Sequence, residues 1–139
     1  MGNSFEKHFV IENQIEELTS LAEEIDELAS DWGLSAKLAM NMNLALEEAL
    51  SNIIFYAFSD NKKHKIKISV FLNINKLKIV IMDDGSPFNP LSQDKPDITL
   101  QAEDRPIGGL GIFLISKMMD EMNYTRKDNQ NVLSLYKSI

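Results

Sequence analysis

The sequence predicts a two-layer α/β sandwich, in which a mixed, mainly antiparallel sheet of about five strands carries three helices on one face. Apolar residues recur at three- and four-residue spacing over residues 12–31 and 35–58, which predicts two helices. Apolar residues alternate with mostly polar ones over residues 66–72 and 76–83, which predicts two strands joined by a short reversal. With 139 residues and 44% hydrophobic content, the chain fits one compact domain with a single core.

The first half of the chain is predicted to form a strand and two helices. Residues 4–11 are assigned to the strand because their apolar side chains alternate loosely. The first helix, residues 12–31, has acidic residues opposite its apolar face and ends at Gly33. Ser35 is the predicted N-cap of the second helix, which continues to Phe58. Because this second helix is apolar on several sides, we expect it at the centre of the fold.

After the two strands, the chain loses all periodicity over residues 84–107, where all four prolines lie. A loop of this length is either functional or disordered, and four of the six glycines bracket it, as expected of a hinged lid. The chain is predicted to close with a helix over residues 110–120 and a hairpin of residues 122–127 and 131–137, turning at Asp128-Asn129.

Composition and charge restrict the classes of partner. The net charge of −7 opposes general affinity for nucleic acid or an anionic membrane, so protein or small-molecule partners are expected. The absence of cysteine excludes disulfides, thiol catalysis and cysteine-based zinc sites. Charge interrupts the N-terminal stretch before a signal peptide can develop, and no apolar run is long enough to span a membrane. A cytoplasmic protein is therefore expected.

Residues 44–58 form an almost wholly apolar helical stretch that nevertheless contains Glu48 and Asn52. These two side chains are four residues apart and therefore lie on one face of the helix. Burying either without a partner would cost roughly 1–3 kcal/mol, so a polar ligand is expected against this face. The alternative is a solvated stripe on an otherwise buried helix, and the residues alone do not decide between the two. Glu47 is the more ordinary surface residue.

Asp83 ends the second predicted strand and, by alternation, falls on the same face as Leu77 and Ile81. Asp84 then points away from the core. A carboxylate on the core side indicates a binding function slightly more than the alternative, an ordinary acid that opens a turn through Asp84-Gly85.

Gly108, Gly109 and Gly111 precede the third predicted helix. Three glycines are an unfavourable start for an apolar helix, and close approach of a phosphate to backbone N–H groups explains them better than flexibility alone. The spacing does not match the dinucleotide-binding fingerprint, and no phosphate-loop motif is present. His8 and His64 are isolated and lack metal-ligand spacing, so they are assigned structural or surface roles.

Along the chain, these features are E-A-L-S-N on a helix, a strand ending in D-D-G, a long loop, and G-G-L-G-I-F-L-I opening a helix. This combination resembles the GHKL superfamily of ATP-binding domains and is most similar to its anti-sigma factor serine kinase branch, of the RsbW and SpoIIAB type. The resemblance covers nearly the whole chain. It implies the Bergerat-type ATPase fold, with ATP and Mg²⁺ as cofactors and the nucleotide held between the helices and the sheet edge.

By that resemblance, Glu48 matches the general base and Asn52 the magnesium ligand. Asp83 matches the acid that accepts a hydrogen bond from the adenine amino group, and Gly85 the glycine that lets the base approach. The remaining nucleotide-binding positions implied are the phosphate-side glycines Gly108, Gly109 and Gly111, and a lid arginine, Arg105. One departure affects the first glycine box, which usually reads DxGxG and here continues from Gly85 as Ser86-Pro87.

The resemblance implies an ATP-dependent serine/threonine protein kinase that acts in partner switching. Such proteins bind a sigma factor, phosphorylate a small STAS-domain antagonist and are usually homodimers. The alternative is a non-catalytic ATP-binding module that sequesters a protein partner, although a pure binder would not need the base Glu48. A detached histidine kinase domain fits less well, because no dimerisation helix with a phosphoacceptor histidine precedes the motifs.

Overall fold

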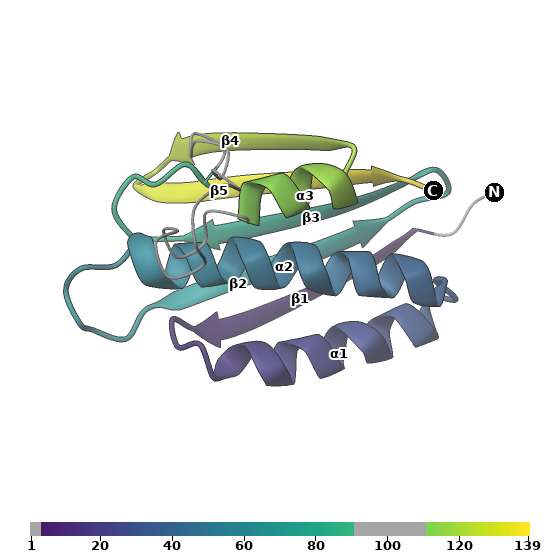
Figure 1. Cartoon of the computed structure of the whole chain (residues 1–139), viewed down its shortest axis with the longest axis horizontal. Coiled ribbons are helices and arrows are strands. Elements are labelled where there is room, and N and C mark those ends of the chain that lie inside the picture. Colours follow the sequence, from purple (N-terminus) through teal and green to yellow (C-terminus); the bar gives the residue numbers. More distant parts are fainter. Residues whose placement is uncertain (1–3, 91–110) are drawn as a thin grey trace, which may run out of the picture.

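The computed structural model describes residues 4–90 and 111–139, with side chains from residue 115 onward in the second range. The strands form one sheet in the order β1-β2-β3-β5-β4, and the helices lie together on one of its faces (Figure 1). This arrangement confirms the predicted α/β sandwich. Along the chain, the described elements are β1 (Phe5–Glu12), α1 (Glu17–Asp31), α2 (Ala36–Tyr56), β2 (Lys65–Leu72), β3 (Lys76–Asp83), α3 (Gly111–Met118), β4 (Glu121–Lys127) and β5 (Gln130–Ser138).

The four strand pairings in the described part of the chain are all antiparallel. Ile81 of β3 lies opposite Ile68 of β2 on one side and Leu133 of β5 on the other, so a row of buried apolar residues crosses the sheet. The hairpin between β4 and β5 turns at Asp128 and Asn129, whose φ angles of 53° and 62° suit a two-residue turn. The mainly antiparallel prediction is confirmed, whereas the parallel pairing of a mixed sheet is absent from the described residues.

The start of the first helix differs from the prediction, because α1 begins at Glu17 and not at residue 12. Glu12 is still part of β1, where it pairs with Lys65 of β2. The backbone amide of Asn13 then donates to the carbonyl of His64 (3.0 Å). These backbone groups are already used by the sheet and its connection, so the helix can begin only after them.

The capping signal at the start of α2 predicted the helix boundary correctly, whereas the C-terminal ends of α2 and α3 differ from the prediction. Ser35 caps α2 as predicted, since its side chain accepts a hydrogen bond from the backbone amide of Leu38 (3.1 Å). α2 ends at Tyr56 and not at residue 58, and α3 ends at Met118 and not at residue 120. In the second case the amide of Asp120 donates to a carbonyl of β5, which draws the chain into the sheet.

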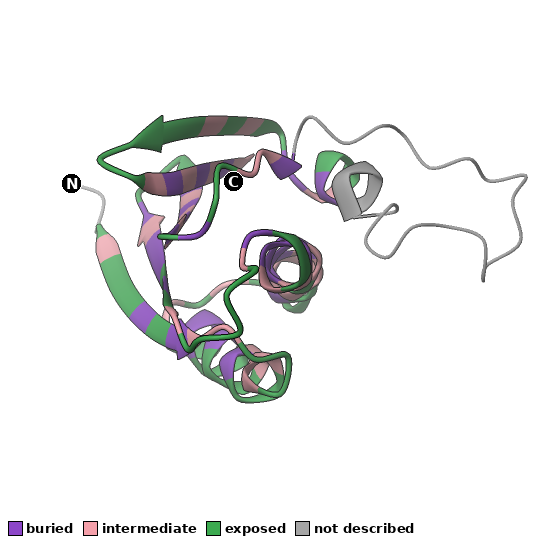
Figure 2. Cartoon of the chain, turned by 90° about the vertical axis from the view of Figure 1, so that its left-hand side faces the viewer, coloured by how far each residue is buried: buried purple, intermediate pink, exposed green. Residues whose placement is uncertain are grey.

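α2 is the central helix, as predicted. Figure 2 shows the buried residues gathered where α2 faces the sheet. Met42, Leu46 and Leu50 of α2 are fully buried, and burying each such side chain stabilises the fold by roughly 1.5–3 kcal/mol. Within the described part of the chain, no helix is both long and apolar enough to cross a membrane. The sheet residues buried below α2 include Ile66, Ile68, Leu77, Ile79 and Ile81.

Candidate functional site

The C-terminal ends of α2 and β3 lie at the same end of the sandwich, on the left in Figure 1, and both elements carry buried polar residues. Asp83, the last residue of β3, lies directly opposite Asn131 of β5. The backbone amide of Ser86 donates to the carbonyl of Ala57 (2.8 Å), which joins the end of α2 to the end of β3. Asn52, Asp83 and Asn131 are only 2–3% exposed, so their polar atoms must find partners within the protein or in a ligand.

Among the described residues, one carboxylate oxygen of Asp83 has hydrogen-bond partners and the other has none. Its Oδ1 accepts hydrogen bonds from the backbone amide of Gly85 (2.9 Å) and from Nδ2 of Asn131 (3.0 Å). Its Oδ2 is buried and has no partner among the described residues. Burial raises the pKa of Asp83, and the hydrogen bonds from Asn131 and Gly85 oppose that rise. A buried, unpaired carboxylate oxygen is a strong acceptor for a ligand that brings a donor.

Asn131 holds Asp83 in place and was missed by the sequence reasoning. Its Nδ2 donates both to Asp83 and to the carbonyl of Ser86 (2.9 Å). Its Oδ1 accepts from the backbone amide of Phe88 (3.1 Å) and from the hydroxyl of Tyr124. The available signal was alternation, since Asn131 occupies the same strand face as the buried leucines that follow it in β5.

Gly85 is required by a close approach to the end of α2. A Cβ atom at this position would lie 2.6 Å from the carbonyl oxygen of Ala57 and 2.9 Å from Oδ1 of Asp83. The sequence reasoning connected this glycine with room for a ligand. In the structure the packing of the chain against itself already requires glycine.

Replacing Gly85 with Ala is therefore expected to destabilise the fold by roughly 1–3 kcal/mol, because backbone atoms must move to admit the methyl group. Urea unfolding followed by circular dichroism measures the change. Ser86→Ala is the control, since Ser86 is exposed in the same loop and should change stability by less than about 0.5 kcal/mol. An unchanged unfolding midpoint in Gly85→Ala would contradict this packing requirement.

Glu48 and Asn52 lie one turn apart near the C-terminal end of α2. Nδ2 of Asn52 donates to the backbone carbonyl of Glu48 (2.8 Å), and the amide oxygen is the atom of this side chain with which a cation would be coordinated. Glu48 is partly buried, and its pKa is raised first by burial and then by the neighbouring Glu47. Glu47 is exposed, as expected for the ordinary surface residue.

Two further contacts shape the loop after β3, and neither was predicted. Nη1 of Arg126, from β4, donates to the carbonyl of Gly85 (2.7 Å). The rings of Tyr56 and Phe88 lie 5.9 Å apart, which connects the last residue of α2 with the loop. Residues 84–90 are thus held by contacts from β4, β5 and α2.

Several predicted site residues lie outside the described residues. These are Arg105, Gly108 and Gly109, together with the part of the predicted 84–107 lid beyond residue 90. Gly111 is the first residue of α3.

His64 has a structural role, as the sequence predicts, but it is not isolated in space. Its Nε2 lies 2.8 Å from Oδ2 of Asp60 and its Nδ1 lies 3.0 Å from Oδ1 of Asp84, while its ring stacks on Phe58 at 4.7 Å. Both ring nitrogens face carboxylates, an arrangement that favours the doubly protonated imidazolium. The hydrogen bond to Asp60 is the largest cause of a raised His64 pKa, and burial opposes it.

This cluster predicts a stability that depends on pH. A raised pKa in the folded state means that the stabilisation is fully present below the unfolded pKa of about 6.5 and is lost as the pH rises through the folded value. Urea unfolding of the wild type and of His64→Gln, from about pH 5 to about pH 9, measures the effect. The stability difference between the two proteins should shrink with rising pH. A difference that stays constant over the range would contradict the assignment of a charged His64.

One match to a known family covers nearly the whole chain. Residues 11–137 match the family described as the histidine kinase-like ATPase domain. The chain belongs to this family. Membership of this ATPase family implies that the chain binds ATP, and the buried polar residues at the end of β3 are the candidate place for it.

Curated relatives of this ATPase-domain chain are named as serine or serine/threonine protein kinases. Serine/threonine-protein kinase BtrW of Bordetella bronchiseptica is 29% identical over 101 residues, covering 73% of this chain and 71% of that protein. Serine-protein kinase RsbW of Bacillus cereus is 33% identical over 110 residues, covering 76% and 68%. RsbW of Listeria monocytogenes is 29% identical over 99 residues, covering 68% and 63%. The chain therefore spans about two thirds of these relatives' length.

A solved member with the same architecture is the histidine kinase domain of the blue-light activated histidine kinase from Erythrobacter litoralis EL346. It superposes with a TM-score of 0.51 at 18% identity, covering 88% of this chain and 59% of that chain. At this identity the likeness shows the fold alone.

Proposed function

We propose that this protein is an ATP-dependent serine/threonine kinase of the anti-sigma factor type, which binds Mg-ATP and phosphorylates a STAS-domain antagonist. The observation that carries the proposal is the buried Oδ2 of Asp83, which lacks a partner among the described residues. Membership of the ATPase family and the kinase names of the relatives support it. We further expect a sigma factor as the second partner, a homodimer as the assembly and the cytoplasm as the compartment.

The described residues fit the adenine and magnesium ends of this ligand. Adenine carries an amino group that can donate to Oδ2 of Asp83. Guanine presents a carbonyl oxygen at the same place, so two acceptors, this oxygen and Oδ2, would face each other. The amide oxygen of Asn52 would coordinate Mg²⁺, which prefers hard oxygen ligands and keeps several waters and phosphate oxygens. The positions proposed for the phosphate side are Gly108, Gly109, Gly111 and Arg105.

Glu48 is the residue proposed to act in phosphate transfer. Bound ATP would supply the phosphoryl group, and Mg²⁺ held by Asn52 would neutralise the charge that develops on the phosphate. The carboxylate of Glu48 accepts the proton of the substrate serine as the hydroxyl oxygen bonds to the terminal phosphorus and the bond to ADP breaks. The raised pKa of Glu48 makes its carboxylate a stronger base, provided that it remains ionised. Asn52 lies one helical turn away, so base and metal ligand act on the same phosphate end.

The proposal is tested in two steps. Calorimetry with ATP, ADP and GTP, with and without Mg²⁺, should show magnesium-assisted binding that prefers adenine. Incubation with Mg-ATP and the STAS-domain proteins of the same organism should then transfer phosphate to a serine or threonine, identified by mass spectrometry. ATP binding without transfer to any of them would favour the non-catalytic binding module. Absence of ATP binding would overturn the proposal.

A further inference from the structure

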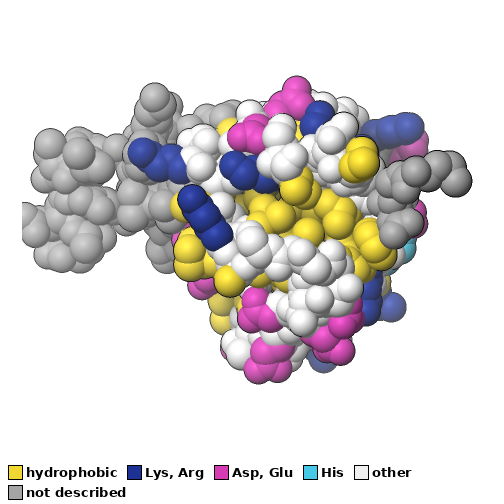
Figure 3. Space-filling model, turned by 90° about the vertical axis from the view of Figure 1, so that its right-hand side faces the viewer, with side chains coloured by type: hydrophobic (Ala, Val, Ile, Leu, Met, Phe, Trp, Pro, Cys, Tyr) yellow, Lys and Arg dark blue, Asp and Glu magenta, His cyan; other side chains and the backbone are white. Residues whose placement is uncertain are grey.

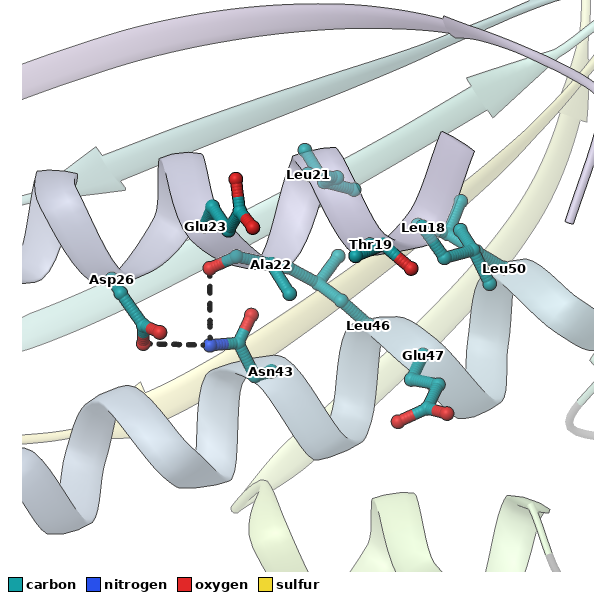
Figure 4. A pocket seen from close by; sticks show the side chains of 10 residues that line it. All are labelled: Leu18, Thr19, Leu21, Ala22, Glu23, Asp26, Asn43, Leu46, Glu47 and Leu50. Atoms are coloured by element: carbon teal, nitrogen blue, oxygen red, sulfur yellow. Dashed lines mark hydrogen bonds between the residues drawn. The ribbon is translucent and has the colours of Figure 1, made fainter. Parts of the chain in front are cut away.

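A groove runs between α1 and α2 on the side of the helices that faces away from the sheet (Figure 4). Its volume is about 330 Å³. Side chains from both helices contribute to its walls over more than one turn. Its floor is apolar: Leu18 and Ala22 are partly exposed there, above the buried Leu21, Leu46 and Leu50.

The rim of the groove is acidic. Glu23 and Asp26 of α1 and Glu47 of α2 all line it and are exposed. α1 carries six acidic residues among its 15 and no lysine or arginine. Figure 3 shows Asp and Glu side chains gathered along the lower edge of the molecule, where α1 lies in Figure 1. The negative charge therefore borders an apolar surface, and a ligand of this groove should bring both apolar and positive groups.

The groove has the length and stiffness of a helix-binding site. Leu18 and Asp26 are eight residues apart on α1, a distance of about 12 Å, while residues i and i+7 of a docked helix span about 10.5 Å. Nδ2 of Asn43 donates to Oδ1 of Asp26 (2.9 Å), which fixes the two helices relative to each other at one end. Two apolar residues of the same part of the chain have large exposed fractions, Ile15 just before α1 (39%) and Met40 of α2 (57%).

We infer that this groove docks a basic amphipathic helix of a partner protein. Leucine-like side chains at i, i+3 or i+4, and i+7 would occupy the floor, and lysine or arginine residues beside them would face Glu23, Asp26 and Glu47. A second copy of this chain is disfavoured, because pairing the same groove by symmetry would bring the acids of α1 together. The inference uses none of the proposed nucleotide-binding residues and does not depend on the proposed function.

The test uses a fluorescein-labelled helical peptide of about 14 residues, with leucines along one face and lysines or arginines on the other. Fluorescence anisotropy should show binding that weakens with added salt, and a peptide of scrambled order should bind much less. Glu23→Gln with Asp26→Asn should weaken binding roughly two- to tenfold, because two rim charges are lost while Asp26→Asn retains an acceptor for Asn43.

The matched control is Glu24→Gln with Glu27→Gln, which removes the same charge from the flank of α1 that faces β1. This pair should leave peptide binding unchanged. Ala22→Gln, which fills the groove, should weaken binding roughly tenfold or more, equivalent to the loss of one buried leucine. Circular dichroism checks that each variant is folded.

Three results would overturn the inference. Equal weakening by the two charge pairs would mean that general acidity attracts the peptide. Equal binding of the scrambled peptide would mean that the groove does not recognise an amphipathic helix. Light scattering that shows a dimer broken by Ala22→Gln would mean that a second copy occupies the groove.

Discussion

Glu48→Gln is expected to reduce phosphate transfer roughly a hundred- to ten-thousand-fold while ATP still binds. Glutamine keeps the shape of the side chain and its place one turn from Asn52, but it cannot accept the serine proton. A general base acts in the transition state and contributes little to the affinity for bound nucleotide. Transfer rates under single-turnover conditions and ATP affinity by calorimetry measure the two effects separately.

Glu24→Gln is the control for this variant, because Glu24 is an exposed acid of α1 outside the nucleotide site. The wild-type rate should also fall as the pH drops through the raised pKa of Glu48, since only the ionised carboxylate is a base. Transfer by Glu48→Gln at the wild-type rate would remove Glu48 from the chemistry. Loss of ATP binding in this variant would instead show a role in holding the nucleotide.

Asp83→Asn is expected to weaken ATP binding by roughly 1–3 kcal/mol, or about tenfold to a hundredfold. The amide keeps an oxygen for Gly85 and Asn131, but its NH₂ group replaces Oδ2 and meets the adenine amino group, so that two donors oppose each other. GTP presents a carbonyl at that position and should lose less affinity than ATP. Calorimetry with both nucleotides measures this change of preference.

The free energy of unfolding of Asp83→Asn distinguishes a lost adenine contact from damage to the fold. Burial raises the pKa of Asp83, which means that its charge is costly to bury, so Asp83→Asn should not lower the free energy of unfolding. Asp84→Asn is the control, because it removes the same charge at the adjacent exposed position. Unchanged ATP affinity in Asp83→Asn would show that adenine does not contact this residue. Equal losses in both variants would show that only the general negative charge matters.

The inner-face position of Asp83 was predictable because strand alternation is a local property of the chain. The same holds for the Ser35 cap and for the common face of Glu48 and Asn52. The partners of these residues were not predictable in this way. Asn131 is 48 residues from Asp83 along the chain, and their hydrogen bond exists only because β5 pairs with β3.

Boundary errors have the same origin. The pattern of apolar residues extended the first helix back to residue 12, but the backbone of Glu12 pairs with β2. The contact of His64 with Asp84 was not predictable from the pattern, because Asp84 is 20 residues further along the chain. Gly85 must be glycine because the carbonyl of Ala57 lies close to it, and these two residues meet only when α2 packs against the sheet.

The sequence by itself determined the periodicities, and with them the α/β class, the central α2 and the faces on which Glu48, Asn52 and Asp83 lie. Only the tertiary structure decided that, among the described residues, one buried oxygen of Asp83 has partners and the other has none. It also decided that His64 lies between two acids, and that α1 and α2 leave an apolar groove with an acidic rim. The physical reason is distance along the chain. Helix and strand periods arise between near neighbours, whereas burial and hydrogen-bond partners arise from strand pairing and helix packing between distant segments.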